Sequence, residues 1–123
     1  MGLQFENLVL NNHATVLRLL DIKTEEVIAD NPFFQRATSR QQGCQIDYLI
    51  QTKFNTLYVC EIKFSKNPIG MNVVTAIQEK IKRLKVPRYM SCRPVLIHVN
   101  GVTDDVRHAD YFAHMIDFSL LLE

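Results

Sequence analysis

Residues 43–65, GCQIDYLIQTKFNTLYVCEIKFS, decide the fold of this chain. They read as two strands, residues 46–50 and 57–64, because both segments are rich in β-branched and aromatic residues that alternate along the chain. A polar turn within residues 52–56, centred near Phe54, separates them. The stretch therefore predicts a β-hairpin.

Alternation along the hairpin sorts its side chains onto two faces. One face of the first strand carries Ile46, Tyr48 and Ile50, and the other carries Asp47, Leu49 and Gln51. In the second strand, Glu61 and Lys63 point the same way. Since Asp47 and Glu61 are equidistant from Phe54, we expect them directly across the ladder, with their β-carbons about 5 Å apart.

Two carboxylates so placed repel each other, and half-buried charge is costly unless something pairs with it. A divalent cation between Asp47 and Glu61 removes the conflict, and oxygen ligands suit Mg²⁺ or Mn²⁺, with the backbone carbonyl of Ile62 as a further candidate ligand. Lys63 then lies beside the metal, where it holds a phosphate oxygen or a metal-bound water. Gln45, one pleat before Asp47 and facing Lys63, positions Lys63 or a phosphate oxygen. A solvated strand edge with plain surface charges is the alternative.

Asp47 followed by Glu61-Ile62-Lys63 on the next strand resembles the PD-(D/E)xK nuclease superfamily. The lead-in Gly-Cys-Gln-Ile-Asp, the stretch EIKFS and the opening GLQFENLV are more narrowly similar to the nuclease-like C-terminal domain of a group of prokaryotic AAA-type ATPases. The chain departs from the superfamily pattern at Ile46, where a proline is usual. It departs from the RecB-like subgroup at Lys82, where a tyrosine would follow Gln78.

The resemblance implies a catalytic site and its partners. It implies hydrolysis of phosphodiester bonds that depends on Mg²⁺ or Mn²⁺. DNA is favoured over RNA as the substrate. Glu6, in GLQFENLV, matches the first-helix glutamate that often faces the metal site in the superfamily, so it is a candidate ligand of a second ion. A solvated glutamate on the helix face is the alternative. An AAA-type ATPase domain, in cis or in trans, is an implied partner. A homodimer is a further candidate, because double-strand cutters of the superfamily are commonly dimers.

Composition bounds the remaining possibilities. The 123 residues, 47% of them hydrophobic, suit a single domain over residues 1–123. The net charge of +1 means that nucleic-acid contact must come from a local patch. The three cysteines lack metal-ligand spacing and read as reduced thiols, and we find neither a signal peptide nor a membrane span, so we expect a cytoplasmic protein. The start of the chain inside its first helix suggests a domain cut from a longer protein or a very compact gene product.

The rest of the chain supplies the elements around the hairpin. Hydrophobic periodicity and turn signals predict helices over residues 3–20, 71–85 and 104–109, strands over 33–40 and 94–99, and a closing strand and tail over 112–122. The run PVLIHV is expected to be a buried central strand. This order predicts an α/β fold with an αβββαβ core, a central mixed sheet flanked by helices. The superfamily resemblance implies the same restriction-endonuclease-like core.

One local region is positively charged. Between residues 80 and 93 the chain carries no acidic residue and six basic ones: Lys80, Lys82, Arg83, Lys85, Arg88 and Arg93. A surface that follows a phosphate backbone is one interpretation, and a solvated helix face is the other.

Two further functions stay open beside the nuclease. One is a catalytically silent regulatory or interaction domain of an AAA-type ATPase that keeps the fold and part of the site. The other is a plain nucleic-acid binder that uses the positive region. The second predicts binding that weakens steeply with salt and does not depend on Mg²⁺.

Overall fold

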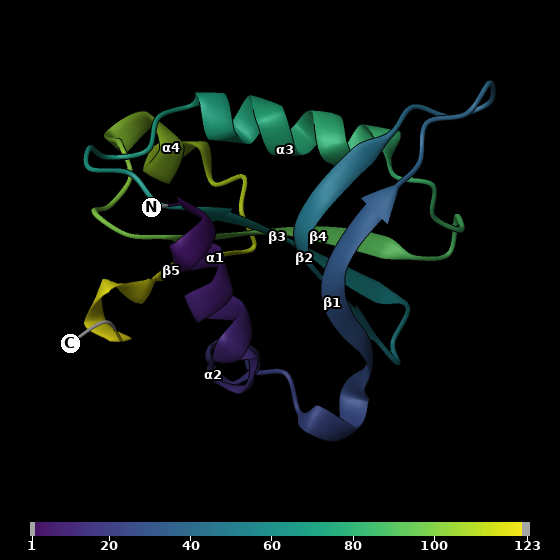
Figure 1. Cartoon of the computed structure of the whole chain (residues 1–123), viewed down its shortest axis with the longest axis horizontal. Helices are drawn as coiled ribbons and strands as arrows, with labels where there is room; N and C mark the ends of the chain where they lie inside the picture. Colours follow the sequence, from purple (N-terminus) through teal and green to yellow (C-terminus); the bar gives the residue numbers. More distant parts are fainter. Residues whose placement is uncertain (1, 122–123) are drawn as a thin grey trace.

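The computed structural model describes residues 2–121. The elements are, in chain order, α1 (Gly2–Asn11), α2 (His13–Leu19), the 3-10 helix η1 (Thr24–Glu26), β1 (Val27–Gln35), β2 (Cys44–Thr52), β3 (Thr56–Lys63), α3 (Asn72–Arg83), β4 (Ser91–His98), α4 (Asp104–Ala109), β5 (His114–Asp117) and the 3-10 helix η2 (Phe118–Leu121). The predicted αβββαβ order is present, and α4 and β5 extend it (Figure 1).

The five strands form one mixed sheet in the order β1-β2-β3-β4-β5. The first three are antiparallel neighbours, with a loop of residues 36–43 between β1 and β2 and a short turn between β2 and β3. β4 runs parallel to β3, and α3 makes the crossover between them. β5 then runs parallel to β4. The C-terminal ends of β3, β4 and β5 therefore lie side by side at one end of the sheet.

Helices cover both faces of this sheet (Figure 1). On one face, residues of α1 and α2 such as Phe5, Val9 and Val16 pack with Tyr48 and Ile62 in a buried cluster. On the other face, α3 and α4 close a second cluster, whose members include Val59, Val73, Ile77, Leu96 and Val106. The fold is thus a three-layer α/β sandwich with the hairpin in its middle layer.

β4 is the buried strand that the apolar run predicts. Val95, Leu96 and Ile97 are each 0% exposed. Val95 and Ile97 belong to the cluster under α1, whereas Leu96 belongs to the cluster under α3. A strand covered on both faces needs apolar residues at successive positions, which explains the continuous run.

The predicted single helix over residues 3–20 is wrong in one respect, because it is two helices. Asn12 leaves the helical conformation, with φ of −116° and ψ of 33°. Its side-chain amide donates to the carbonyl oxygen of Leu8 at 2.8 Å. Asparagine competes with the backbone for such hydrogen bonds, so Asn12 separates α1 from α2.

The predicted first strand over residues 33–40 is also misplaced, since β1 begins at Val27 and ends at Gln35. Pro32 lies inside the strand. β1 is an edge strand, where a proline without an N–H group is tolerated. The last residue of the predicted tail, Leu122, lies outside the described residues.

Within residues 2–121, no helix is long and apolar enough to cross a membrane.

Candidate active site

The β2–β3 hairpin opens at the position of the predicted site. Its ladder runs from Thr52 opposite Thr56 to Tyr48 opposite Cys60, so the turn is centred on Phe54 as predicted. Asp47 and Glu61 occupy the next positions in this register. Instead of continuing the backbone ladder, Asp47 Oδ2 accepts a hydrogen bond from the backbone N–H of Ile62 at 2.9 Å. The carboxylate therefore bridges the two strands where they separate.

A β-bulge on the other side of β2 sets the direction of Asp47. Asn31 pairs with Leu49 and Phe33 pairs with Ile46, so Asp47 and Tyr48 together face only Pro32. Proline has no N–H group to donate, which favours a bulge at this point. Bulges bend a strand and redirect its side chains.

The bulge overturns one predicted face assignment. We expected Ile46 to share a face with Tyr48 and Ile50. Ile46 packs in the cluster under α3, whereas Tyr48 and Ile50 pack in the cluster under α1. The extra residue in β2 shifts the alternation by one position, so all three remain buried but on different faces.

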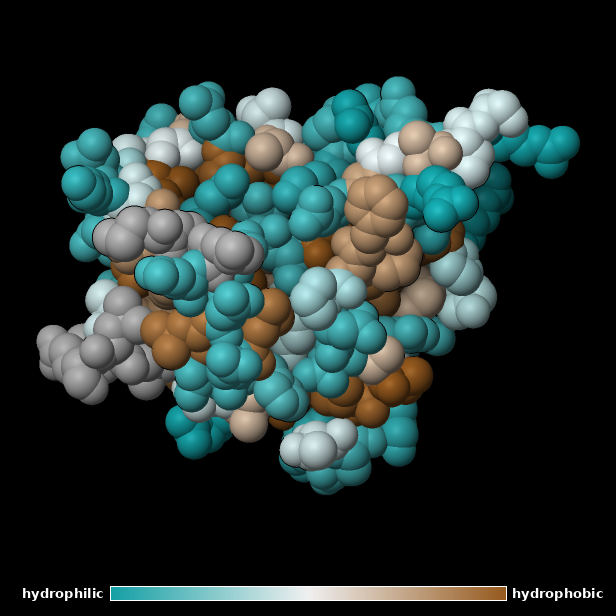
Figure 2. Space-filling view, viewed as in Figure 1, coloured by the Kyte–Doolittle hydropathy of each residue, from teal (hydrophilic) through white to brown (hydrophobic). Residues whose placement is uncertain are grey.

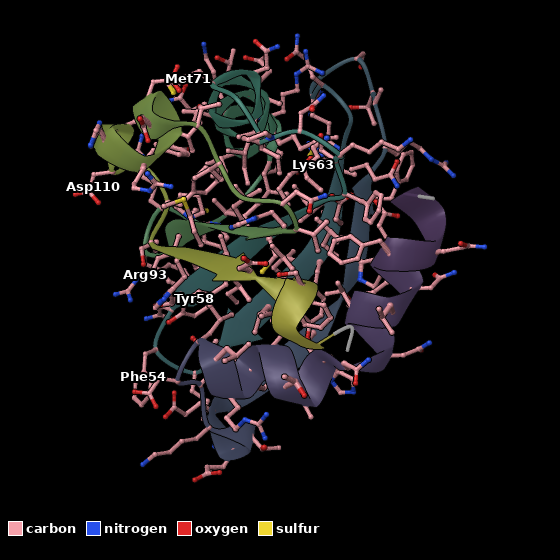
Figure 3. The ribbon with its side chains drawn as sticks, turned by 90° about the vertical axis from the view of Figure 1, so that its left-hand side faces the viewer. Phe54, Tyr58, Lys63, Met71, Arg93 and Asp110 are labelled. Atoms are coloured by element: carbon pink, nitrogen blue, oxygen red, sulfur yellow. The ribbon has the colours of Figure 1, made fainter. Side chains whose placement is uncertain are left out.

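Glu61 is a buried carboxylate with two lysine partners. Its side chain is 3% exposed, and Lys80 Nζ donates to Oε1 at 3.1 Å and to Oε2 at 2.9 Å. Lys63 Nζ lies 3.4 Å from Oε1, with its side chain 46% exposed. An unpaired charge at this depth would be strongly unfavourable, and the two lysines compensate the carboxylate. Figure 3 shows Lys63 at the far end of the hairpin from Phe54, in the region between the ribbons of α1 and α3.

The position of Lys80 in the site was missed at the level of sequence, where it counted only as part of the positive region. The spacing of Lys80 from its apolar neighbours does indicate this position. Lys80 lies three residues after Ile77 and four before Leu84, which are both buried. This spacing places it on the inward stripe of α3. A lysine on such a stripe needs a buried anion, and Glu61 is that anion.

Asp47 is half-buried and its pKa is raised, chiefly because burial disfavours the charged form. The Ile62 N–H, Lys80 and Lys63 act in the opposite direction and lower the pKa, while the nearby Glu6 raises it. The charged groups that act on Asp47 thus come from α1, β3 and α3.

The other two predicted site residues, Glu6 and Gln45, make no hydrogen bond to the site among the described residues. Glu6 is half-buried on α1 and acts on Asp47 through space, with no hydrogen bond between their side chains among the described residues. Gln45 is exposed and pairs with Phe34 of β1. Within the described chain, no hydrogen bond joins Gln45 to Lys63.

The positive region divides in the structure. Lys82, Arg83 and Lys85 line an open hollow together with residues 38–42 of the β1–β2 loop, including Arg40. This loop projects from the molecule as a hydrophilic extension (Figure 2). Arg83 also pairs with Glu79 at 3.0 Å. Arg88 is exposed outside the hollow. Arg40 is a basic residue of this surface that the sequence did not indicate, because the loop brings it there from far along the chain.

His98 lies next to the site on β4. It pairs in register with Lys63 on one side and Asp117 on the other. It is 5% exposed, and its Nδ1 has no hydrogen-bond partner among the described residues. Burial lowers the pKa of His98, partly offset by Asp117. It is therefore a buried histidine with one ring nitrogen unpaired among the described residues.

The candidate ligand atoms at the opened end of the hairpin are oxygens, which hard divalent cations such as Mg²⁺ prefer. Asp47 keeps its Oδ1 outside the hydrogen bond to Ile62, and the Ile62 carbonyl and Glu6 are further oxygen donors. Among residues 2–121 no three His, Cys, Asp or Glu side chains are close enough to form a metal cluster. Mg²⁺, however, commonly binds through one or two carboxylates, water and substrate phosphates. The residues fit such an ion, provided that Lys80 yields its place on Glu61.

The chain is similar to known proteins in its fold. No protein-family model and no curated protein sequence matches the chain. Two solved structures are similar to it. One, the protein of unknown function AF1548, has a TM-score of 0.58 at 14% identity, covering 85% of this chain and 55% of that one. The other, a repair endonuclease from Pyrococcus abyssi, has a TM-score of 0.53 at 15% identity, covering 90% of this chain and 43% of that one.

This chain thus spans about half the length of the structures that it resembles. At these identities the likeness shows the fold alone. It confirms the predicted α/β class, a mixed sheet flanked by helices, and its similarity to a restriction-endonuclease-like repair endonuclease fold.

Proposed function

We propose that this chain is a metal-dependent nuclease domain that hydrolyses phosphodiester bonds in DNA. The observation that carries the proposal is the meeting of Asp47, Glu61 and Lys63 at the opened end of the hairpin, in a fold similar to that of a repair endonuclease. A buried carboxylate beside a second carboxylate and an exposed lysine is unfavourable for stability alone, which favours a functional reason for the arrangement.

Each residue has a role in this proposal. Asp47, Glu61 and the Ile62 carbonyl hold one Mg²⁺ or Mn²⁺, and Glu6 assists a second. A bound divalent cation supplies a lowered pKa for an attacking water and neutralises charge on the scissile phosphate. The Ile62 N–H holds the Asp47 carboxylate in its orientation through the 2.9 Å hydrogen bond.

Lys63 and Gln45 act on the reacting groups. Lys63 Nζ is half exposed at the mouth of the site, where it holds the attacking water or stabilises the negative charge that develops on the phosphate. Gln45 is exposed on the neighbouring strand and positions a phosphate oxygen. Neither role requires the side chain to be buried.

The DNA backbone is assigned to the positive surface. Lys82, Arg83 and Lys85, joined by Arg40 of the β1–β2 loop, present positive charge around one hollow. Lys80, which binds Glu61, and Arg83 of the hollow are one helical turn apart on α3. Arg88 extends the surface beyond the hollow. We infer phosphate contacts here without base specificity.

A catalytically silent interaction domain is the second candidate. The observation that favours it is the occupation of both Glu61 oxygens by Lys80. In that case an AAA-type ATPase domain, in cis or in trans, would be the partner that the resemblance implies. A homodimer and a cytoplasmic location stay predictions in both cases.

Nicking of supercoiled plasmid and of a labelled single strand tests the proposal, with Mn²⁺, Mg²⁺ or chelator present. We expect cleavage that needs metal and is lost in Asp47→Ala and Lys63→Ala. Lys53→Ala is the matched control, because Lys53 is an exposed lysine at the other end of the hairpin. Absence of cleavage by the unsubstituted chain at high concentration with both metals would favour the silent domain.

A further inference from the structure

The ion pair between Lys80 and Glu61 is the most enclosed charged contact in the described chain. Lys80 reaches the site from the last turn of α3 and donates to both oxygens of one carboxylate, at 3.1 and 2.9 Å. Its side chain is 27% exposed and that of Glu61 is 3% exposed. The nuclease proposal assigns no role to this lysine, although it holds the oxygens that a cation would use.

The charges around Glu61 show what a second cation would meet. The Glu61 carboxylate already has two ammonium groups beside it, with Lys80 Nζ at 3.1 and 2.9 Å from its oxygens and Lys63 Nζ at 3.4 Å from Oε1. A divalent cation on the same oxygens brings a third positive group into a partly buried region. Withdrawal of the Lys80 ammonium removes one of these positive groups. Repulsion between the ion and the ammonium at hydrogen-bond distance is strong where water is scarce.

We propose that Lys80 is the resident cation of the site, whose ammonium group occupies the position on Glu61 that a divalent cation must take. Lys80 thereby sets the metal affinity of the site and keeps the carboxylate oriented until the ion arrives. The inference rests on the proposed nuclease function, and it makes Lys80 a positioning residue, because it acts through Glu61.

The surroundings of Lys80 allow this exchange. Its backbone is fixed by the buried neighbours Ile77 on α3 and Leu84 directly after the helix. Its ammonium group ends a flexible four-carbon stem, and part of the side chain is exposed. Withdrawal therefore needs only a change of side-chain rotamers, with the helix left in place. Lys63, which is further from Glu61 and half exposed, stays available for the substrate.

Binding of Mn²⁺ by the whole chain, measured by isothermal titration calorimetry, tests the proposal. We expect Lys80→Met to bind Mn²⁺ about tenfold more tightly than the unsubstituted protein, because the competing charge is gone. Lys80→Arg keeps a cation and should retain the weaker affinity. Lys82→Met is the matched control, since Lys82 is an exposed lysine on the same helix, and should leave the affinity unchanged. Equal or weaker binding by Lys80→Met would overturn the proposal and leave Lys80 as a structural counter-ion.

A measurement on the unsubstituted protein covers the case in which Lys80→Met does not fold. The rate of amine acetylation at Lys80, followed by mass spectrometry with Lys82 as internal reference, reports whether the ammonium is engaged. We expect Mn²⁺ to speed modification of Lys80 relative to Lys82. An unchanged or slower rate, with Mn²⁺ bound, contradicts displacement.

Failure of the metal site and failure of the proposed role of Lys80 give different results. If the unsubstituted protein, Lys80→Met and Lys80→Arg all bind no Mn²⁺, the metal assignment of the nuclease proposal fails and the role of Lys80 fails with it. If all three bind with the same affinity, the metal site stands and only the role of Lys80 is wrong.

Discussion

At the scale of single residues, Glu61 is the group whose environment is most demanding. It lies at 3% side-chain exposure, and Lys80 and Lys63 compensate its charge. Removing one member of a buried pair leaves the other uncompensated, which costs more than the pair contributes.

Replacing Glu61 tests this dependence. We expect Glu61→Ala to lower the free energy of unfolding by about 1.5–3 kcal/mol, because the charge-assisted hydrogen bonds from Lys80 are lost. The control is Glu79→Ala, which breaks the exposed pair with Arg83 and should change stability by less than about 1 kcal/mol. Urea denaturation measures both. Equal effects of the two substitutions would show that Glu61 is solvated rather than buried.

His98 makes stability depend on pH at the same edge of the sheet. Burial lowers its pKa in the folded chain, so protons bind the unfolded chain more readily. Its contribution is therefore fully present above its unfolded pKa of about 6.5 and is lost as the pH falls through the lower folded value. The groups that face it in register are Lys63 and Asp117.

We expect the melting temperature to fall between about pH 7 and about pH 5, and this fall to be smaller in His98→Leu. His108→Leu is the control, because His108 is exposed on α4. Melting curves followed by circular dichroism at several pH values measure the difference. A pH profile of His98→Leu that matches the parent would assign the pH dependence to other groups.

At the scale of elements, the hairpin turn decides where the carboxylates meet. Asn55 adopts a left-handed conformation with φ of 56°, and Ser91 N–H donates to its carbonyl oxygen at 2.9 Å. Asparagine tolerates this region, glycine adopts it freely and β-branched residues do not.

Substitution of Asn55 therefore separates backbone strain from side-chain contacts. We expect Asn55→Val to destabilise the fold by about 1–2 kcal/mol and Asn55→Gly to be nearly neutral. Chemical denaturation of both variants provides the measurement. If Asn55→Gly lost as much stability as Asn55→Val, the asparagine side chain would matter and the backbone conformation would not.

The hairpin, the crossover helix and β4 were predictable from sequence, because each is written in a local pattern. Alternation in the hairpin, the spacing of apolar residues on α3 and the apolar run of β4 report burial directly. The break at Asn12 and the strand around Pro32 were not predictable in this way. The break at Asn12 depends on the hydrogen bond of its side chain to the Leu8 carbonyl. The strand around Pro32 depends on the bulge of β2.

For the site itself, the sequence placed Asp47, Glu61 and Lys63 at one end of a hairpin, and the structure brings these three side chains together. The contribution of Lys80 depends on how α3 docks on the sheet, which no local pattern states, although its spacing from Ile77 and Leu84 indicates the inward face. The metal-binding and catalytic roles of all these residues stay predictions.

At the scale of the whole molecule, a chain with net charge +1 binds a polyanion only through a concentrated surface. The hollow between α3 and the β1–β2 loop is such a surface, with Arg40, Lys82 and Lys85 around it. Each phosphate that a basic residue neutralises makes affinity more dependent on salt.

Charge reversal tests this surface. We expect Arg40→Glu combined with Lys82→Glu to abolish binding of short duplex DNA at low salt, and Lys82→Gln alone to reduce the slope of log affinity against log salt by about one. Fluorescence anisotropy over a salt series gives both quantities. Lys23→Glu, an exposed lysine before η1, is the control. Unchanged binding in the double variant would make the hollow a solvated face.

The central claim is that Asp47 acts chemically and not as a structural bridge, and Asp47→Asn isolates the two roles. Asparagine keeps an oxygen that accepts the Ile62 N–H but removes the carboxylate charge. The most direct measurement is single-turnover cleavage of labelled DNA with Mn²⁺ by the unsubstituted chain and by Asp47→Asn, with melting curves of both. We predict metal-dependent cleavage that falls by at least about a hundredfold in Asp47→Asn while the melting temperature is maintained or rises. Cleavage that persists in Asp47→Asn, or is absent from a fully folded parent with metal bound, would contradict the account.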